Sequence, residues 1–413
     1  MRIIKFVPIL YFLIINLLIV LLLSSCSEKE KLKVNWEPDL QYAKQEMLQN
    51  EIALKINDDL AKTFSAQMDR IINFLPKYKS DDQVKIDLSK ALASIEQVHT
   101  KLEYENENVL PFIIYLYNEK LYVVNTLPQY SNILFAELTE INHQPVAKIM
   151  ETLKDVVSVD NEQGLLVEIP SHLVRYSILH GLGIVGEDQD NLPVSFLLED
   201  HTEINISVPW VYQGDTTLRL INPYKDDLLY KKLRDSNYTY TYLAEDNTLY
   251  AAYNSCSEDP NYSMEQYSDD IVQTINNFPV GKLIIDLRNN RGGNSEVIQP
   301  LLEKLLNIPK IQHRIVVLMG RYSASSAMSA AIELRSRLNA TLIGEPVNGD
   351  PNKPGDIRSF KLDESGLNII YSTKEFHMLD TKDKGLNPDV YVNTTIEDLR
   401  KGIDPVMEQA IKY

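Results

Sequence analysis

The folded part of the chain begins with a helical pattern. The region at 27–103 starts with a charged tether, "SEKEKLKVN" at 27–35. After the tether, apolar residues recur every three or four positions to about residue 103, which is the spacing of a buried helix face. After the polar run at 79–83, the residues on this face are Val84, Leu88, Leu92 and Ile95. One more step of four residues reaches His99, so we expect the helix to continue to about residue 103 with His99 on its buried face. Taken alone, a histidine in such a place is more often a core residue than a catalyst.

The pattern changes to short alternating strands between residues 104 and 212. Alternation of apolar and polar residues over a few positions is typical of strands that are buried on one side. The predicted strands are 112–117, 120–125, 133–142, 194–200 and 202–208, and the predicted helices lie near 145–156 and 171–181. The pattern therefore predicts a small β-rich module.

From residue 213 to residue 413, strands alternate with helices. The predicted strands are 282–288, 314–320 and 340–345, and the predicted helices are 294–307 and 323–338. This order predicts a mainly parallel sheet covered by helices, with right-handed crossovers. Loops at the carboxyl ends of such strands commonly bind ligands, and 288–294 and 320–326 are two such loops. The expected fold class is therefore multidomain, with α/β and α+β parts.

The first 26 residues have the pattern of a secretion signal. Arg2 and Lys5 precede an almost wholly apolar run at 7–23, and "LSSC" ends at Cys26. This order resembles a bacterial lipoprotein signal, in which the cysteine is lipidated and becomes the new N-terminus. A transmembrane anchor is the alternative, since the apolar run is near the minimum length for crossing a bilayer. Both alternatives place the folded part outside the cytoplasm, held to a cell membrane, at an outer surface or in a periplasm.

Composition and charge exclude several functions. The 413 residues carry a formal net charge of −17, which argues against nucleic acid as a partner because such binding depends on a basic face.

Cys256 is the other cysteine besides Cys26, so no disulfide is expected within the chain. We interpret Cys256 as a half-buried packing residue rather than a nucleophile. The histidines form no metal-binding motif and no nucleotide motif occurs, so neither a metal nor a cofactor is expected. The oligomeric state stays open.

The loop at 320–326 offers a nucleophile. Ser325 is predicted to lie in the first turn of a helix, where backbone N–H groups lack partners within the helix. The N–H of Ser326 would face an oxyanion formed at this point, and the turn "NNRGG" can bring a second donor from Gly292 or Gly293. Glycine is needed there because a side chain would block the substrate carbonyl. Each pattern alone also fits a helix of small residues packed on a sheet, or an ordinary turn.

Three motifs together resemble a known family. They are "LIIDLRNNRGGN" at 283–294, "GRYSASSAMSAA" at 320–331 and "LIGEPVNG" at 342–349. Their order and spacing are similar to the core of the carboxyl-terminal processing, or tail-specific, serine peptidases. The resemblance implies Ser325 as nucleophile and a crotonase- or ClpP-like α/β peptidase core at 213–413.

A fourth stretch resembles another kind of domain. "AELTEINHQPVAKIMETL" at 136–153 is similar to a segment of PDZ-like domains, which take up peptide ends by strand addition. The resemblance implies a PDZ-like module at 104–212, preceded by the helical region at 27–103. An ordinary α+β insert is the alternative.

The two branches of the peptidase family differ in their base. In the processing branch, a lysine follows the serine in "G-E-P-T-x-G-K-G", but that position here is Asp350, which cannot take the role. Lys353 is an alternative that would need a lowered pKa. In the tricorn-like branch, a histidine in a "D-x-H-T-x-L"-like motif pairs with the serine, and "VHTKL" at 98–102 matches all of it but the aspartate. This branch implies His99 as base, with an unperturbed pKa near 6.5.

The same branch implies an acid late in the chain that orients the histidine. The "G-x-x-P-D" run that follows this acid in the family is present at 385–389. Asp383 is the nearest candidate for the acid and Asp380 the next, while Lys382 stands where the family has a glutamate.

The sequence therefore predicts a membrane-tethered, extracytoplasmic serine endopeptidase that cleaves peptides or unfolded protein tails through an acyl-enzyme. Four residues depart from the family pattern, and they are Val98, Met328, Asp350 and Lys382. These departures favour an alternative, a catalytically degenerate lipoprotein of the same fold that binds peptides or cell-wall material.

Overall fold

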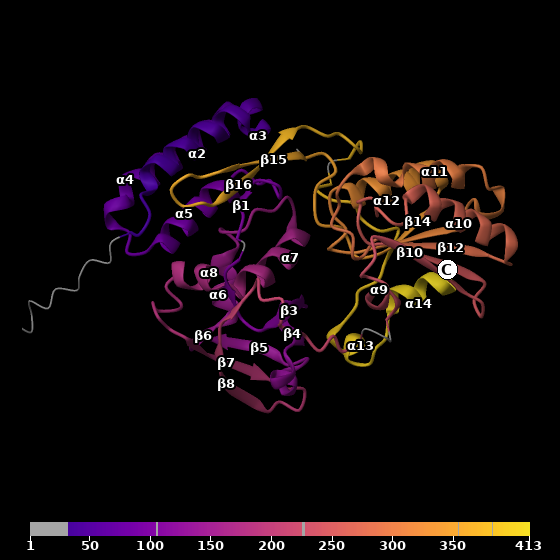
Figure 1. Ribbon diagram of the computed structural model, residues 1–413, viewed down its shortest axis with the longest axis horizontal. Helices are drawn as coiled ribbons and strands as arrows, with labels where there is room; N and C mark the ends of the chain where they lie inside the picture. Colours follow the sequence, from indigo (N-terminus) through magenta and orange to yellow (C-terminus); the bar gives the residue numbers. More distant parts are fainter. Residues whose placement is uncertain (1–31, 105, 225–227, 354, 382) are drawn as a thin grey trace, which may run out of the picture.

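A computed structural model describes residues 32–413, apart from 105, 225–227, 354 and 382. Figure 1 shows three groups of elements, which are the N-terminal helices, a strand-rich module beneath them and an α/β core beside both. The mixed α/β, multidomain character predicted from the sequence is confirmed. The predicted signal and Cys26 lie outside the described residues. Within the described ranges, no helix combines the length and the apolar character needed to cross a membrane.

The core is built on a six-stranded sheet in the order β10-β11-β12-β13-β14-β17. Its strands are β10 Tyr238–Leu243, β11 Thr248–Tyr253, β12 Lys282–Asp286, β13 Ile315–Met319, β14 Thr341–Gly344 and β17 Val390–Tyr391. Neighbours from β11 to β17 are parallel, whereas β10 is antiparallel to β11. Because β12 and β13 are parallel neighbours, their carboxyl ends bring the loops at 287–294 and 320–325 to one edge of the sheet.

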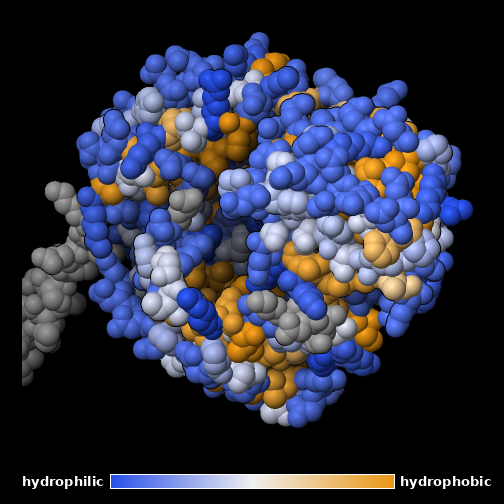
Figure 2. All heavy atoms as spheres, turned by 45° about the vertical axis from the view of Figure 1, so that its right-hand side comes forward, coloured by the Kyte–Doolittle hydropathy of each residue, from blue (hydrophilic) through white to orange (hydrophobic). Residues whose placement is uncertain are grey.

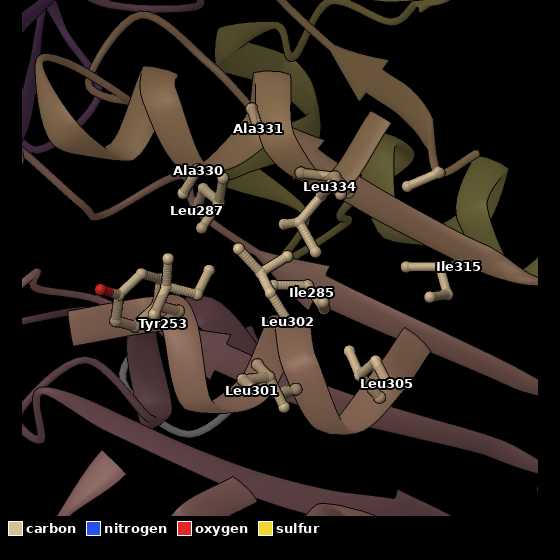
Figure 3. Close-up of a cluster of buried hydrophobic side chains, with 14 of the residues drawn as sticks. Tyr253, Ile285, Leu287, Leu301, Leu302, Leu305, Ile315, Ala330, Ala331 and Leu334 are labelled. Atoms are coloured by element: carbon tan, nitrogen blue, oxygen red, sulfur yellow. The ribbon is translucent and has the colours of Figure 1, made fainter. Parts of the chain in front are cut away.

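Successive residues of the core strands face opposite helical layers, as the period of a strand requires. Helices α10 Met264–Asn277, α11 Gln299–Leu306 and α12 Ser326–Leu338 share one buried cluster, and α14 Pro405–Lys412 belongs to the other. Figure 3 shows the first cluster, where Leu301, Leu302 and Leu305 of α11 gather with Ile285 of β12 and with Ala330, Ala331 and Leu334 of α12. The small alanines let α12 approach the sheet closely, which fixes the start of this helix relative to β13.

The strand-rich module is an antiparallel sheet with short helices packed on it. Its main strands are β3 Phe112–Tyr117, β4 Lys120–Thr126, β5 Glu137–Ile141, β7 Asn191–Leu197 and β8 Glu203–Pro209, and its first helix is α6 Val146–Leu153. Alternate residues of β7 are buried, which is the pattern that predicted these strands. The helix predicted at 171–181 is instead two helices, α7 Glu162–Leu173 and α8 Tyr176–Gly181.

The prediction of a helix that continues to about residue 103 is wrong. The N-terminal helices are α2 Trp36–Asn50, α3 Ile52–Ile56, α4 Asp58–Phe74 and α5 Asp81–Ala93. Ser94 closes α5, and Glu96 has a φ of 57°, which a right-handed helix cannot contain. His99 therefore lies in a turn rather than on the buried face of α5, and strand β1 Lys101–Leu102 follows it.

A hairpin from the C-terminal part of the chain reaches back to the N-terminal helices. It consists of β15 Gly355–Lys361 and β16 Asn368–Lys374, and β16 pairs with β1. Figure 1 shows the hairpin lying along the N-terminal helices. Its residues Leu362, Ile369 and Tyr371 are buried in the helical cluster. The sequence pattern, which grouped 213–413 in one core, did not reveal this excursion.

Arg321 joins the module to the core. Its guanidinium donates two hydrogen bonds to the Glu345 carboxylate, at 3.0 and 2.8 Å, and one at 2.6 Å to the carbonyl oxygen of Leu116 in β3. The same group lies over the Tyr115 ring, 4.6 Å from its centre. Because Arg321 is only 5% exposed, water cannot replace these partners, and the module is held against the loop that leads to Ser325.

We expect Arg321→Met to destabilise the protein by about 3 kcal/mol, because Glu345, whose side chain is only 13% exposed, would keep its charge without its cation. The double variant Arg321→Met/Glu345→Gln lacks that charge, so it should recover part of the lost free energy of unfolding. Arg335→Met is the control, since Arg335 and Asp389 are 3.8 Å apart and 33% and 43% exposed, and such pairs contribute about 0–1 kcal/mol. Urea unfolding followed by circular dichroism measures all four proteins. A double variant no more stable than Arg321→Met would contradict this account.

Candidate active site

Ser325 lies where the loop after β13 becomes helix α12. It is the N-cap residue of α12, with φ 53° and ψ −124°, a conformation that non-glycine residues rarely adopt and that costs on the order of 1–3 kcal/mol. The helix starts at once, since the N–H of Ser329 donates to the Ser325 carbonyl at 3.1 Å. The Ser325 hydroxyl makes no capping hydrogen bond. It is therefore free from its own helix and half-buried at the edge of the sheet.

Asn290 fixes this strained segment, and the sequence analysis did not single it out. Its backbone carbonyl accepts from the Ala324 N–H at 3.1 Å, and its side-chain Oδ1 accepts from the Gly292 N–H at 2.9 Å. Its Nδ2 donates to the Tyr253 carbonyl at 2.9 Å. Asn290 is fully buried, with 0% exposure. One side chain therefore ties the glycine loop after β12 to β11, while its backbone ties that loop to the serine loop after β13.

Gly292 and Gly293 are required where the glycine loop meets Ser325. Gly292 has a φ of +103°, and a Cβ there would lie 2.8 Å from Ser325 Cβ. Gly293 has a φ of +134°, and a Cβ there would lie 2.4 Å from the carbonyl oxygen of Cys256. The Ser326 hydroxyl donates to the Gly293 carbonyl at 2.6 Å, so the two loops are also joined by a hydrogen bond.

This geometry leaves two backbone donors for an oxyanion. The N–H of Ser326 belongs to the first turn of α12, where it has no partner within the helix and where the helix dipole favours negative charge. The bridge between Cys256 and Gly293 uses the Gly292 carbonyl and the Asn294 N–H, which leaves the N–H of Gly293 outside that pairing. The N–H of Gly292 is engaged by Asn290. Ser326 and Gly293 are therefore better placed than Gly292 to stabilise an oxyanion.

The turn that carries His99 is held at several points. The Asp160 carboxylate accepts from the Val98 N–H at 2.8 Å, and the Thr100 hydroxyl donates to the Glu51 carboxylate at 2.6 Å. Burial, and secondarily the nearby Lys101 charge, lowers the pKa of His99 to about 4. The imidazole is therefore neutral, and able to accept a proton, at every pH well above that value.

The structure brings the His99 turn towards the serine loop through intermediate residues. Asp160 also accepts from the N–H of Asp350 at 3.2 Å, and the neighbouring Asn348 forms a parallel bridge with Ala324, the residue before Ser325. In the described part of the chain, no hydrogen bond joins the His99 ring to Ser325 or to a carboxylate. Catalytic hydrogen bonds are often long until a substrate is bound.

Among the described residues, no hydrogen bond or ion pair joins either candidate acid to His99. Asp380 and Asp383 are both exposed, and Asp383 borders a separate cavity of about 950 Å³ between the module, the N-terminal helices and the core. Lys382, the position of the family glutamate, lies outside the described residues. The carboxylates that hold the His99 turn are those of Asp160 and Glu51, and both bind neighbours of His99 rather than its ring.

Two other candidates are occupied elsewhere. The ammonium group of Lys353 donates to the Glu96 carbonyl at 3.0 Å, so it supports the His99 turn instead of facing Ser325. Cys256 is 1% exposed and donates to Asn290 at 3.4 Å, and burial raises the pKa of its thiol. It is therefore more deeply buried than the sequence analysis expected and unsuited to attack a substrate.

A cavity lies beside the glycine loop. Its volume is about 400 Å³, and its lining includes Lys101 of β1, Phe112 of β3, Glu168 of α7, Arg291 and Tyr322. Lys101 and Glu168 form an ion pair at 3.4 Å, and Arg291 lies over the Tyr322 ring at 4.8 Å. Figure 2 shows one face of the molecule, which is hollowed between its two halves. No group of three or more metal-ligating side chains occurs among the described residues.

The chain shares its fold with mature CPAF. A structure of mature CPAF complexed with lactacystin aligns with a TM-score of 0.66 and 13% identity, over 92% of this chain and 97% of that chain. A crystal structure of mature CPAF gives 0.64 and 13%, over 91% and 95%. The photosystem II D1 C-terminal processing protease aligns with a TM-score of 0.43 and 13% identity, over 87% and 93%. No family model and no curated protein matches the chain.

We expect Gly292→Ala to destabilise the protein by about 1–3 kcal/mol, because a Cβ at a positive φ and against Ser325 strains both loops. Gly186→Ala is the control, since a Cβ there would have its nearest neighbour at 3.9 Å. Chemical unfolding of both variants measures the difference. Equal stability of the two variants would show that the close approach of Gly292 to Ser325 is not rigid.

Proposed function

We propose that this protein is a serine peptidase, tethered outside the cytoplasm, that cleaves peptides or unfolded protein tails through an acyl-enzyme. The observation that carries the proposal is Ser325 itself, held at a positive φ at the start of α12 and packed against the glycine loop. The three sequence motifs support it, because they meet at this edge of the sheet. The fold shared with mature CPAF, which extends over 92% of the chain, is consistent with it.

In this proposal, Ser325 Oγ attacks the carbonyl carbon of the substrate while its proton passes to His99. The C–N bond then breaks, and His99 returns the proton to the leaving amine. Water hydrolyses the acyl-enzyme through the same groups in reverse. The N–H groups of Ser326 and Gly293 stabilise the oxyanion in both steps. We infer a serine–histidine pair rather than a triad, because Asp383 and Asp380 are exposed and neither forms a hydrogen bond with the His99 ring among the described residues.

The substrate assignment rests on the edge strand β3. Strand β3 ends the order β3-β4-β5-β7-β8, and Arg321 occupies the Leu116 carbonyl near its far end, so we propose strand addition along the part of its edge around Ile113. Its residue Ile113 is 48% exposed, and the neighbouring Phe112 lines the cavity beside the glycine loop. An extended peptide laid along β3 would pass beside Tyr322, in the loop that leads to Ser325. We propose that the module acts as a PDZ-like peptide-binding unit and that lipid on Cys26 supplies the tether.

A binding protein without catalysis is the second candidate function. The observation that favours it is the His99 ring, which has a pKa of about 4 and no carboxylate partner among the described residues. Such an imidazole is a weaker base than an ordinary one. Chemical labelling of Ser325 distinguishes the two functions.

We expect a fluorophosphonate probe to label soluble protein that begins after Cys26, with the adduct on Ser325, because the oxyanion donors activate the phosphorus centre. Ser325→Ala should abolish labelling. Ser329→Ala is the control, since Ser329 lies one helical turn further along α12 and its hydroxyl contacts Met378 at 3.4 Å. Intact-mass and peptide mass spectrometry locate the adduct. A folded wild-type protein that binds unfolded peptides but resists the probe would favour the binding function.

The identity of the base can be tested by substitution and by pH. We expect His99→Ala to lower kcat/KM on an unfolded substrate by about 10²–10⁴-fold, the usual contribution of a general base, and Lys353→Ala to stay within about tenfold of wild type. Because the pKa of His99 is lowered to about 4, its base form persists as the pH falls below 6.5, and the His99-dependent activity is lost completely only through about pH 4. An inactive Lys353→Ala beside an active His99→Ala would reverse the assignment.

A further inference from the structure

The buried carboxylate of Asp160 connects two parts of the proposed site that come from opposite ends of the chain. Its Oδ1 accepts from the N–H of Val98 at 2.8 Å, directly before His99. Its Oδ2 accepts from the N–H of Asp350 at 3.2 Å. Asp160 is 8% exposed, so water is a poor substitute for either oxygen. A single side chain therefore holds one backbone donor on each segment.

The segment whose N–H binds Oδ2, residues 348–350, lies beside the residue that precedes Ser325. Asn348 pairs with Ala324, and a Cβ on Gly349 would lie 3.8 Å from Asp160 Oδ2 and 3.8 Å from the Met328 side chain of α12. The adjacent Asn161 donates to the Gly349 carbonyl at 3.0 Å. Residues 160 and 161 therefore bind an N–H and a carbonyl of the same loop, which fixes its position against the first turn of α12.

We propose that Asp160 is a positioning residue, which sets the place of His99 relative to Ser325 by holding the His99 turn and the 348–350 loop in one arrangement. Its catalytic consequence rests on the proposed peptidase function, whereas the coupling of the two segments does not. Glu51 binds the other side of the His99 turn, but its remaining partners are the N–H groups of Ala53 and Ser372. Glu51 therefore anchors the turn to the N-terminal helices and the hairpin, not to the serine loop.

The two hydrogen bonds require the carboxylate form of Asp160. A protonated carboxyl group carries a donor on one oxygen, so one of the two backbone N–H groups would lose its acceptor. Burial raises the pKa of Asp160 to about 6, against the opposing effects of its two hydrogen bonds and of Lys353, while Asp350 raises it further. Other charged side chains around the cavity that Asp160 borders are Lys90, Glu96, Lys154, Asp155, Glu162, Asp383 and Lys384. His99 and Lys101 are the charged or titratable groups that follow Val98 on the turn.

The sign of the pH dependence follows from the raised pKa. Above about pH 6 the carboxylate accepts both N–H groups, and as the pH falls through about 6 one of these bonds is lost. His99 is still neutral at that point, because its own pKa is about 4. The wild-type enzyme should therefore lose activity in two separate steps, a partial one from Asp160 and a complete one from His99.

Kinetics of Asp160→Asn test the proposal. We expect kcat at pH 7.5 to fall about 10–100-fold, the usual effect of a small misplacement of a catalytic group, with KM changed by less than about threefold. The variant should show no step near pH 6, because its amide does not titrate. Asp155→Asn is the control, since Asp155 borders the same cavity but is exposed. A kcat within twofold of wild type, or a retained step near pH 6, would overturn the proposal.

Amide hydrogen exchange tests the coupling without reference to catalysis. In wild type, the segments 96–100 and 348–353 should exchange faster together once the pH falls below about 6, after correction for the intrinsic pH dependence. Asp160→Asn should show the faster exchange at all pH values, and Asp155→Asn should behave as wild type. If wild type has no peptidase activity but shows this joint change, the proposed function fails and the coupling stands. If the two segments do not change together in wild type, the role of Asp160 is excluded even for an active enzyme.

Discussion

The proposed site depends on one unfavourable backbone conformation, the positive φ of Ser325. This angle is unfavourable in energy for a serine, so contacts with the surrounding structure must maintain it. Asn290 does so from the neighbouring strand end, where it binds Ala324 and Gly292. The alanines of α12 allow the helix to lie close to the sheet. The strained conformation of Ser325 therefore depends on the parallel pairing of β12 and β13, because this pairing places the glycine loop and the serine loop side by side.

Buried carboxylates hold the three parts of the molecule together around that edge. Glu51 joins the N-terminal helices to the hairpin, and Asp160 joins the His99 turn to the 348–350 loop. Glu345 holds Arg321, whose guanidinium joins the core to the module through the Leu116 carbonyl. A buried charge is tolerated only where hydrogen bonds or an opposite charge compensate its lost hydration. Each carboxylate has such partners, and some of those of Glu51 and Asp160 come from a distant part of the sequence. The same contacts that make these charges tolerable thus fix the relative positions of the three parts.

Local pattern predicted the elements of the site but not their connections. Strand β3 lies at the residues predicted for it, and β12, β13 and β14 fall within their predicted ranges, because alternation and buried apolar runs reflect burial directly. The end of α5 could not be predicted in this way, since the positive φ of Glu96 and the pairing of β1 with β16 depend on residues far along the chain. The same limit applies to Glu51 and Ser372, which are 321 positions apart. Asn290 was visible as part of a motif, but its role depends on contacts that spacing cannot show.

The low pKa of His99 bears on the choice between catalysis and binding. Forming an imidazolium where the pKa is about 4 costs roughly 3 kcal/mol more than it does for an ordinary histidine. A serine–histidine pair must offset this cost through its oxyanion donors, and the N–H groups of Ser326 and Gly293 are suited to that because charge develops beside them at the N-terminus of α12. A protein that only binds peptides would need neither those donors nor the strain at Ser325. The strain is nevertheless maintained by contacts from β11, from the glycine loop and from the alanines of α12. A strained, uncapped serine beside free backbone donors is the arrangement that a reactive nucleophile requires, and on this ground we favour catalysis over binding alone.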